Sequence, residues 1–133
     1  MQSYTAFQNF ALFVLRAIVA AVFFVAGYQK FQFWSGSHPE MTAWMLTLTN
    51  ILSIAEPLGA AALVLGFLTR WAASGLLIIM IGAIYYLQFK FGIGFVMPTS
   101  AGWNFPLTLL GGCIILIAFG AGAWSVDAVR RRR

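Results

Sequence analysis

The segment SIAEPLGAAALVLGFLTR, Ser53–Arg70, decides how the rest of the chain is interpreted. Within it stands Glu56, the only acidic residue in the interior of any long apolar run of the sequence. Placing a charged side chain at the centre of a lipid bilayer costs about 2.5–3.5 kcal/mol on insertion scales. A partner, a proton or water must offset that cost. The identity of whatever faces Glu56 is therefore the central question about this chain.

The composition of the whole chain favours a membrane protein. Its 133 residues are 62% hydrophobic and 8% charged, with a mean hydropathy of +0.89, whereas soluble domains carry about 25% charged residues. A chain this short cannot bury so much apolar surface in a soluble fold. At about 20 residues per crossing, the length accommodates one domain with four spanning helices.

Four apolar segments predict these helices. They cover about residues 10–30, 44–67, 71–89 and 105–124, and a basic tail follows at 125–133. Segments bearing Gly and Pro separate the first span from the second and the third from the fourth. We therefore predict an all-α integral membrane four-helix bundle, formed by a single transmembrane domain over residues 1–133.

The distribution of charge and of tryptophan predicts the orientation. Lys and Arg accumulate on the cytoplasmic side of a membrane and Trp at both of its interfaces. A basic tail there also contacts anionic lipids. We therefore expect both termini in the cytoplasm. The residues behind this prediction are Arg130, Arg131, Arg132 and Arg133 in the tail, Trp71 and Trp124 at the inner interface, and Trp34, Trp44 and Trp103 at the outer interface.

Several function classes do not fit the sequence. The net charge of +5 does not indicate nucleic-acid binding, because half of the eight basic residues lie in the terminal run and no basic face exists elsewhere. Cys113 and His38 are single residues of their kind, so we expect no metal site and no disulfide within the chain. No nucleotide-binding, metalloprotease or nucleophile-elbow motif occurs, so we expect no cofactor held by this chain alone.

Small residues share a helix face with Glu56. Ser53, Gly59 and Ala60 lie on that face, and small residues mark packed helix interfaces rather than lipid-facing surfaces. We therefore expect Glu56 to point into the bundle. Pro57 removes one backbone donor directly beside it and favours a kink there, which makes room for water or a neighbouring side chain.

Two basic residues of the first span compete as partner of Glu56. Counting residues from the cytoplasmic end places Arg16 within about 6 Å of the depth of Glu56, so Arg16 is the preferred partner. Lys30, at the outer end of the same span, is the alternative. The pair either fixes helix register or forms a proton, ion or quinone-headgroup site. Asn104 is a further polar candidate at the outer end of the fourth span.

Three stretches resemble the DoxX family of small bacterial four-helix membrane proteins. They are GYQKF at 27–31, AEPLGAAALVLGFLTR at 55–70 and FGAGAWSVDA at 119–128. The chain departs from the family pattern in two places: Pro57 and Leu58 stand where many members have a glycine-rich continuation, and Asn104 stands where many members have a second Glu. The positions that fit are Arg16, Gly27, Lys30, Glu56, Gly66, Thr69, Arg70, Gly120, Gly122, Trp124, Ser125 and Asp127.

The resemblance implies a multi-pass protein of the bacterial inner (plasma) membrane. Some relatives are DoxD-like subunits of thiosulfate:quinone oxidoreductase. The resemblance therefore implies an accessory subunit or scaffold of a membrane redox or respiratory complex, lining a quinone or lipid pocket. Its partners would be membrane lipids and other membrane subunits or further copies of itself, and we expect a subunit rather than an enzyme. The alternative is a small proton-coupled transporter or channel component that uses Glu56.

Overall fold

The computed structural model describes residues 4–132 and is all-α, as predicted. Two short helical turns, Phe31–Trp34 and Tyr86–Lys90, extend the first and third helices. Thr5 and Gln8 cap the first helix reciprocally, and Thr42 caps the second. The α-helices are α1 (Ala6–Lys30), α2 (Ala43–Leu65), α3 (Thr69–Tyr85), α4 (Asn104–Phe119) and α5 (Val126–Arg130).

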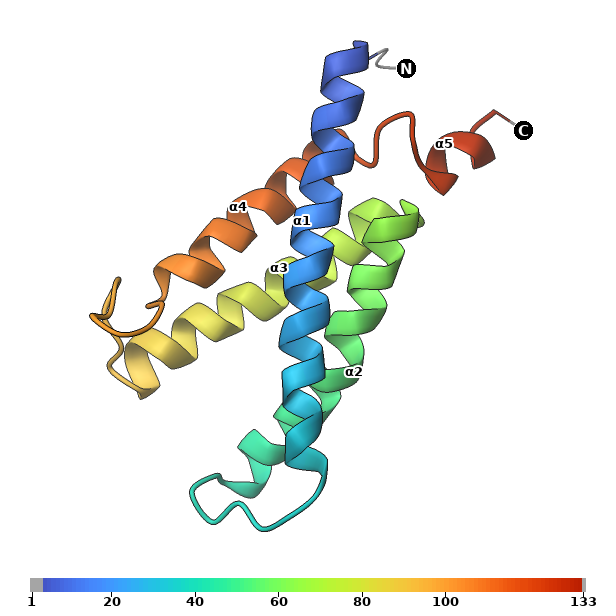
Figure 1. The fold of residues 1–133 in the computed structure, drawn as a ribbon. Helices are drawn as coiled ribbons and strands as arrows, with labels where there is room; N and C mark the ends of the chain where they lie inside the picture. The colour runs from blue at the N-terminus through green and yellow to red at the C-terminus, as the bar shows by residue number, and fades with distance from the viewer. Residues whose placement is uncertain (1–3, 133) are drawn as a thin grey trace.

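The long helices form two antiparallel hairpins, α1 with α2 and α3 with α4, which pack against each other (Figure 1). The start of α1, the short helix α5 and the α2–α3 turn lie at one end of the molecule, here called the terminal end. The loops 31–42 and 91–103 close the opposite ends of the two hairpins, which diverge there, and this side is here called the loop end. This arrangement is the predicted four-helix bundle. Which end faces the cytoplasm stays a prediction.

Three helical stretches of the described chain are long and apolar enough to cross a membrane. They run over Ala6–Trp34, Ala43–Leu65 and Thr69–Lys90. The fourth helix has 16 residues, about 24 Å at 1.5 Å per residue, against a hydrocarbon core of about 30 Å. It ends at Phe119 rather than near residue 124 as predicted. The reason is Gly120, whose φ of 76° leaves the helical region.

The bundle closes around small residues and a thin apolar core. Gly27 of α1 packs directly on Pro57 of α2, and a methyl group at Gly27 would overlap the proline ring. This close approach brings the halves of α1 and α2 near the loop end into contact. The buried apolar residues come from all four long helices: Leu12, Val19, Ala20, Phe23, Ala60, Leu63, Ala73, Leu76, Met80, Leu109, Cys113 and Leu116.

The five tryptophans sort between the two ends as the sequence predicts. Trp34, Trp44 and Trp103 lie next to the loops of the loop end, whereas Trp71 and Trp124 lie next to the turns of the terminal end. The indole N–H groups of two of them donate to neighbouring elements. The indole of Trp34 donates to Ser53 Oγ of α2 at 2.8 Å, and that of Trp44 donates to the Tyr86 hydroxyl at 3.1 Å.

Candidate functional site

Glu56 pairs with Lys30. The Lys30 Nζ lies 2.7 Å from the Glu56 Oε2, and the same ammonium donates to the Ala26 carbonyl at 3.2 Å. Only 2% of the Glu56 side chain is exposed, against 26% for Lys30. The pair therefore joins the end of α1 to the middle of α2, and Glu56 is not an unpaired buried carboxylate.

The preference for Arg16 as the partner of Glu56 was wrong, for a geometric reason. Helical side chains tilt toward the N-terminus of their own helix. Because α1 and α2 are antiparallel, the side chain of Arg16 extends toward the terminal end and that of Glu56 toward the loop end. Similar depths of the backbone therefore do not bring the two charged groups together. The tilt instead carries Lys30 back along α1 toward Glu56.

Arg16 has a different set of partners. Its Nη1 donates to the carbonyls of Leu63 and Val64, at 2.9 and 3.2 Å, and its Nη2 donates to the carbonyl of Trp124. The side chain is 1% exposed. A buried cation at the C-terminus of α2 is stabilised by the partial negative charge of the helix end. Arg16 thereby ties α1, the end of α2 and the segment after α4 into one unit.

A cavity of about 480 Å³ lies beside the Lys30–Glu56 pair, with residues of all four long helices in its wall. This volume is within the range of sites for organic ligands, about 300–1,000 Å³. Apart from the ion pair the wall is mainly apolar and aromatic. It includes Phe23, Met45, Leu52, Met80, Tyr86, Leu87, Phe91, Phe105 and Pro106. We call this space the loop-end cavity.

Asn104 is near this cavity but is not joined to the ion pair by a hydrogen bond of the described structure. It begins α4, directly before Phe105 in the cavity wall. Its Oδ1 is buried and accepts no hydrogen bond from the described residues. Of the four predicted polar candidates, the structure thus brings Glu56 and Lys30 together at the cavity and places Arg16 toward the terminal end.

Asp127 holds the terminal end together, a role that spacing alone does not reveal. Its two carboxylate oxygens accept the backbone N–H groups of Leu68 and Thr69, both at 2.9 Å, and so cap the N-terminus of α3. Burial favours the neutral acid, but these backbone hydrogen bonds outweigh it and hold the pKa of Asp127 below its usual value. Asp127 therefore acts as an ionised cap that docks α5 on the α2–α3 turn.

Two further contacts fasten the same region. The Asn9 side chain accepts the Ala123 N–H at 2.7 Å, and Arg70 donates to the Ala118 carbonyl at 3.2 Å. Asn9 was not among the predicted residues, since a lone amide near a helix start carries no distinctive signal. Asn9 thereby joins α1 to the segment after α4, and Arg70 joins the start of α3 to the end of α4.

The twelve positions that carry the family resemblance separate into two clusters. Gly27, Lys30 and Glu56 meet at the α1–α2 contact. The others lie at the terminal end, where they cap helices or provide the backbone turns that the chain needs there. Most of the twelve family positions thus cap helices or form turns at the terminal end. The ion pair beside the loop-end cavity belongs to the smaller cluster of Gly27, Lys30 and Glu56.

The family's sequence profile matches residues 11–91, which contain most of α1, all of α2 and α3, and both members of the ion pair. The chain belongs to the DoxX family. It is similar to the inner membrane protein YqjF of Escherichia coli (strain K12), with 26% identity over 133 positions that cover 95% of this chain and 96% of the relative. No solved structure matches the chain. The family match and the three helical stretches that are long and apolar enough to cross a membrane together show that this is a DoxX-family membrane protein.

Proposed function

We propose that this DoxX-family protein binds a quinone-type ligand in the loop-end cavity and serves as an accessory subunit of a membrane redox complex in the bacterial inner membrane. The observation that carries the proposal is the position of the Lys30–Glu56 pair in the wall of an otherwise apolar cavity. Pockets for small molecules commonly combine apolar walls with a few placed polar groups that fix orientation.

The chemistry of the wall suits a flat ring that carries carbonyl oxygens. An ammonium group has three N–H donors, and Lys30 uses two of them on Ala26 and Glu56. The third is available to a ligand carbonyl. Phe23, Tyr86 and Phe105 provide aromatic surface for the ring. Glu56 keeps Lys30 in place and balances its charge, so that the cavity binds a neutral ligand.

Electron transfer in this proposal belongs to another subunit. Reduction of a quinone to a quinol takes two electrons and two protons, and the sequence contains no motif for a redox group. The partner subunit would supply the electrons, while this chain holds the ring. The proposed role is therefore ligand binding and scaffolding, with both termini on the cytoplasmic side.

The test is binding of a short-tailed quinone to the purified protein in lipid nanodiscs, followed by quenching of tryptophan fluorescence. Gly82 lies in the cavity wall with open space around its Cβ position, so Gly82→Leu fills the cavity without a backbone clash. Gly75 also has open space but lies outside the wall, and Gly75→Leu is the matched control. We expect binding to be lost in Gly82→Leu and kept in Gly75→Leu. Equal binding by both variants would contradict the proposal.

The competing function is a small proton-coupled transporter or channel in which Glu56 takes up and releases a proton. The observation in its favour is the cavity next to a buried carboxylate. Proteoliposomes separate the two functions. Proton flux that depends on Glu56, in a protein that binds no quinone, would replace our proposal with this one. Comigration with other membrane subunits in mild detergent, without such flux, supports the accessory role.

A further inference from the structure

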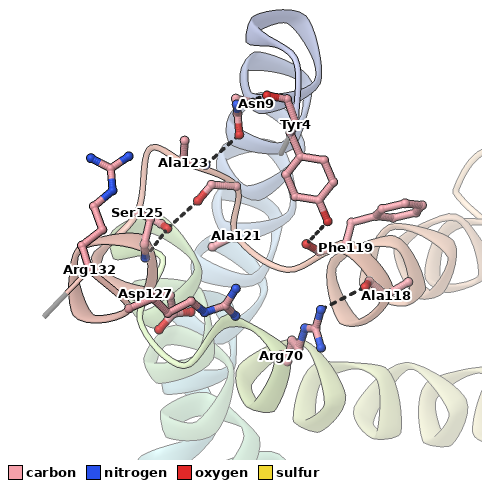
Figure 2. A pocket seen from close by; sticks show the side chains of 13 residues that line it. Tyr4, Asn9, Arg70, Ala118, Phe119, Ala121, Ala123, Ser125, Asp127 and Arg132 are labelled. Carbon is pink, nitrogen blue, oxygen red and sulfur yellow. Dashed lines mark hydrogen bonds between the residues drawn. The ribbon is translucent and has the colours of Figure 1, made fainter. Parts of the chain in front are cut away.

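A second cavity, of about 690 Å³, lies at the terminal end. It is bounded by the start of the described chain, the start of α3, the end of α4 and the tail (Figure 2). Figure 2 shows Arg70 at one side, next to Ala118, and Arg132 at the other side, beyond α5. This terminal cavity is separate from the loop-end cavity and shares no lining residue with it.

The charges around the terminal cavity favour an anion. Three arginines line it, Arg70, Arg131 and Arg132, together with one acidic residue, Asp127. The carboxylate is committed, since both of its oxygens already accept backbone N–H groups at the start of α3. Arg70 donates one hydrogen bond to the Ala118 carbonyl, and a guanidinium has five donors. Positive charge and donor capacity are thus in excess here.

The apolar surroundings indicate that the anion belongs to a lipid. Phe119 lines the cavity and is 44% exposed, and Ile115, one turn earlier on the same helix, is 42% exposed. Together they continue the cavity into an apolar strip along α4. Trp71, directly after Arg70, is 79% exposed, as is usual for a tryptophan at a membrane interface. A ligand with a negative head and apolar tails fits both parts.

We propose that the terminal cavity is a binding site for the headgroup of an anionic phospholipid such as phosphatidylglycerol. The phosphate lies by Arg70 and Arg131, the rest of the headgroup extends toward Arg132 at the far side of the cavity, and an acyl chain runs past Phe119 and Ile115. Guanidinium groups bind phosphate oxygens through paired, charge-assisted hydrogen bonds. The basic tail would then do more than orient the protein in the membrane, because its arginines contribute unequally to lipid binding. Arg131 and Arg132 bind the headgroup, whereas Arg130 lies over the Phe67 ring at 5.5 Å.

The experiment uses the full chain, delipidated in detergent, and measures its thermal unfolding during titration with phosphatidylglycerol or with phosphatidylcholine. The cavity variant is Arg131→Gln/Arg132→Gln. The matched control, Arg130→Gln/Arg133→Gln, removes the same charge from the same tail. For wild type we expect stabilisation by phosphatidylglycerol and little by phosphatidylcholine. The apparent dissociation constant should rise by about tenfold or more in the cavity variant and by about threefold or less in the control.

The remaining outcomes contradict the proposal. Equal weakening in the two variants means that the tail attracts anionic lipid without a defined site. Equal binding by wild type and the cavity variant means that the terminal cavity is not where the lipid binds. A third arm adds glycerol phosphate at the same concentration as the lipid. Stabilisation as strong as that by phosphatidylglycerol would assign the cavity to a free phosphate compound instead. None of these arms involves the quinone of the proposed function.

Discussion

Lys30 and Glu56 form an ion pair across α1 and α2, with Nζ and Oε2 2.7 Å apart, in the wall of the loop-end cavity. Buried ion pairs contribute little net stability, because the loss of hydration offsets their attraction. In the proposed function, the third N–H of Lys30 is the donor that a ligand in the cavity would use. Its position, rather than its strength, links the architecture to the proposed ligand site.

The first prediction concerns the two charges as a unit. Glu56→Gln leaves Lys30 without its carboxylate, and breaking a buried pair in this way costs about 3–5 kcal/mol. The double variant Lys30→Met/Glu56→Leu removes both charges and should recover most of that loss. Unfolding in detergent, followed by circular dichroism, measures both effects. A double variant less stable than Glu56→Gln would show that the pair is not the unit we describe.

The second prediction concerns Arg16, whose bonds join the end of α2 to the segment after α4. We expect Arg16→Met to release residues 120–130 from the bundle, raising their amide hydrogen exchange while the helices near the loop end keep their protection. Arg16→Lys should not restore protection, because a single ammonium does not reproduce the planar fork of guanidinium donors. Unchanged exchange over residues 120–130 in Arg16→Met would contradict this role.

The third prediction uses the lowered pKa of Asp127. A carboxyl group whose pKa is lower in the folded than in the unfolded protein stabilises the fold at pH values above the pKa of the unfolded protein, which is about 3.9 for Asp. This stabilisation is lost as the pH falls through the pKa that the carboxyl group has in the folded protein. Wild type should therefore lose stability on acidification below about pH 4. Asp127→Asn should already be less stable by about 1 kcal/mol at neutral pH and show a smaller acid-induced loss.

Denaturation midpoints measured in steps between pH 6 and pH 3 test this prediction. Ser125→Ala is the matched control, because it removes the N-cap of α5 without changing any titrating group. It should retain the acid-induced loss of wild type. Identical pH dependence of wild type and Asp127→Asn would show that the ionised carboxylate does not cap α3.

The fourth prediction tests the close contact of α1 and α2. Gly27→Ala places a methyl group against the Pro57 ring, and overpacking of this kind costs about 1–3 kcal/mol. Pro57→Ala should relieve part of that cost, so the two changes are coupled in a double-mutant cycle. Gly111→Ala, which meets open space, should be neutral or stabilising. Additive effects at Gly27 and Pro57 would mean that the helices do not touch there.

The sequence predicted the architecture well because hydropathy and small-residue patterns act locally. The fold class, the inward position of Glu56 and the sorting of tryptophans between two ends all depend on such local signals. The fourth helix was placed too long because its apolar run continues past Gly120, where the backbone leaves the helix. Nothing in hydropathy marks that change, although Gly120 and Gly122, both with positive φ, directly follow the helix end.

Side-chain direction and tertiary capping were harder to predict. Depth along the helices favoured Arg16 over Lys30 as the partner of Glu56. The tilt of helical side chains toward the N-terminus of their helix instead brings Lys30 to Glu56. The role of Asp127 depends on a contact with Thr69, 58 residues away. Both cavities are lined by residues from distant parts of the chain, so no single stretch of sequence encodes them.

The central claim is that the cavity beside Lys30 and Glu56 binds a quinone. The most direct measurement is photolabelling of the protein in lipid nanodiscs with a photoreactive quinone, followed by mapping of the labelled peptides. We predict labels within residues 78–87 and 105–109, competed away by unlabelled quinone and absent in Gly82→Leu. Labels confined to residues 115–132, or labels that survive in Gly82→Leu, would contradict the claim.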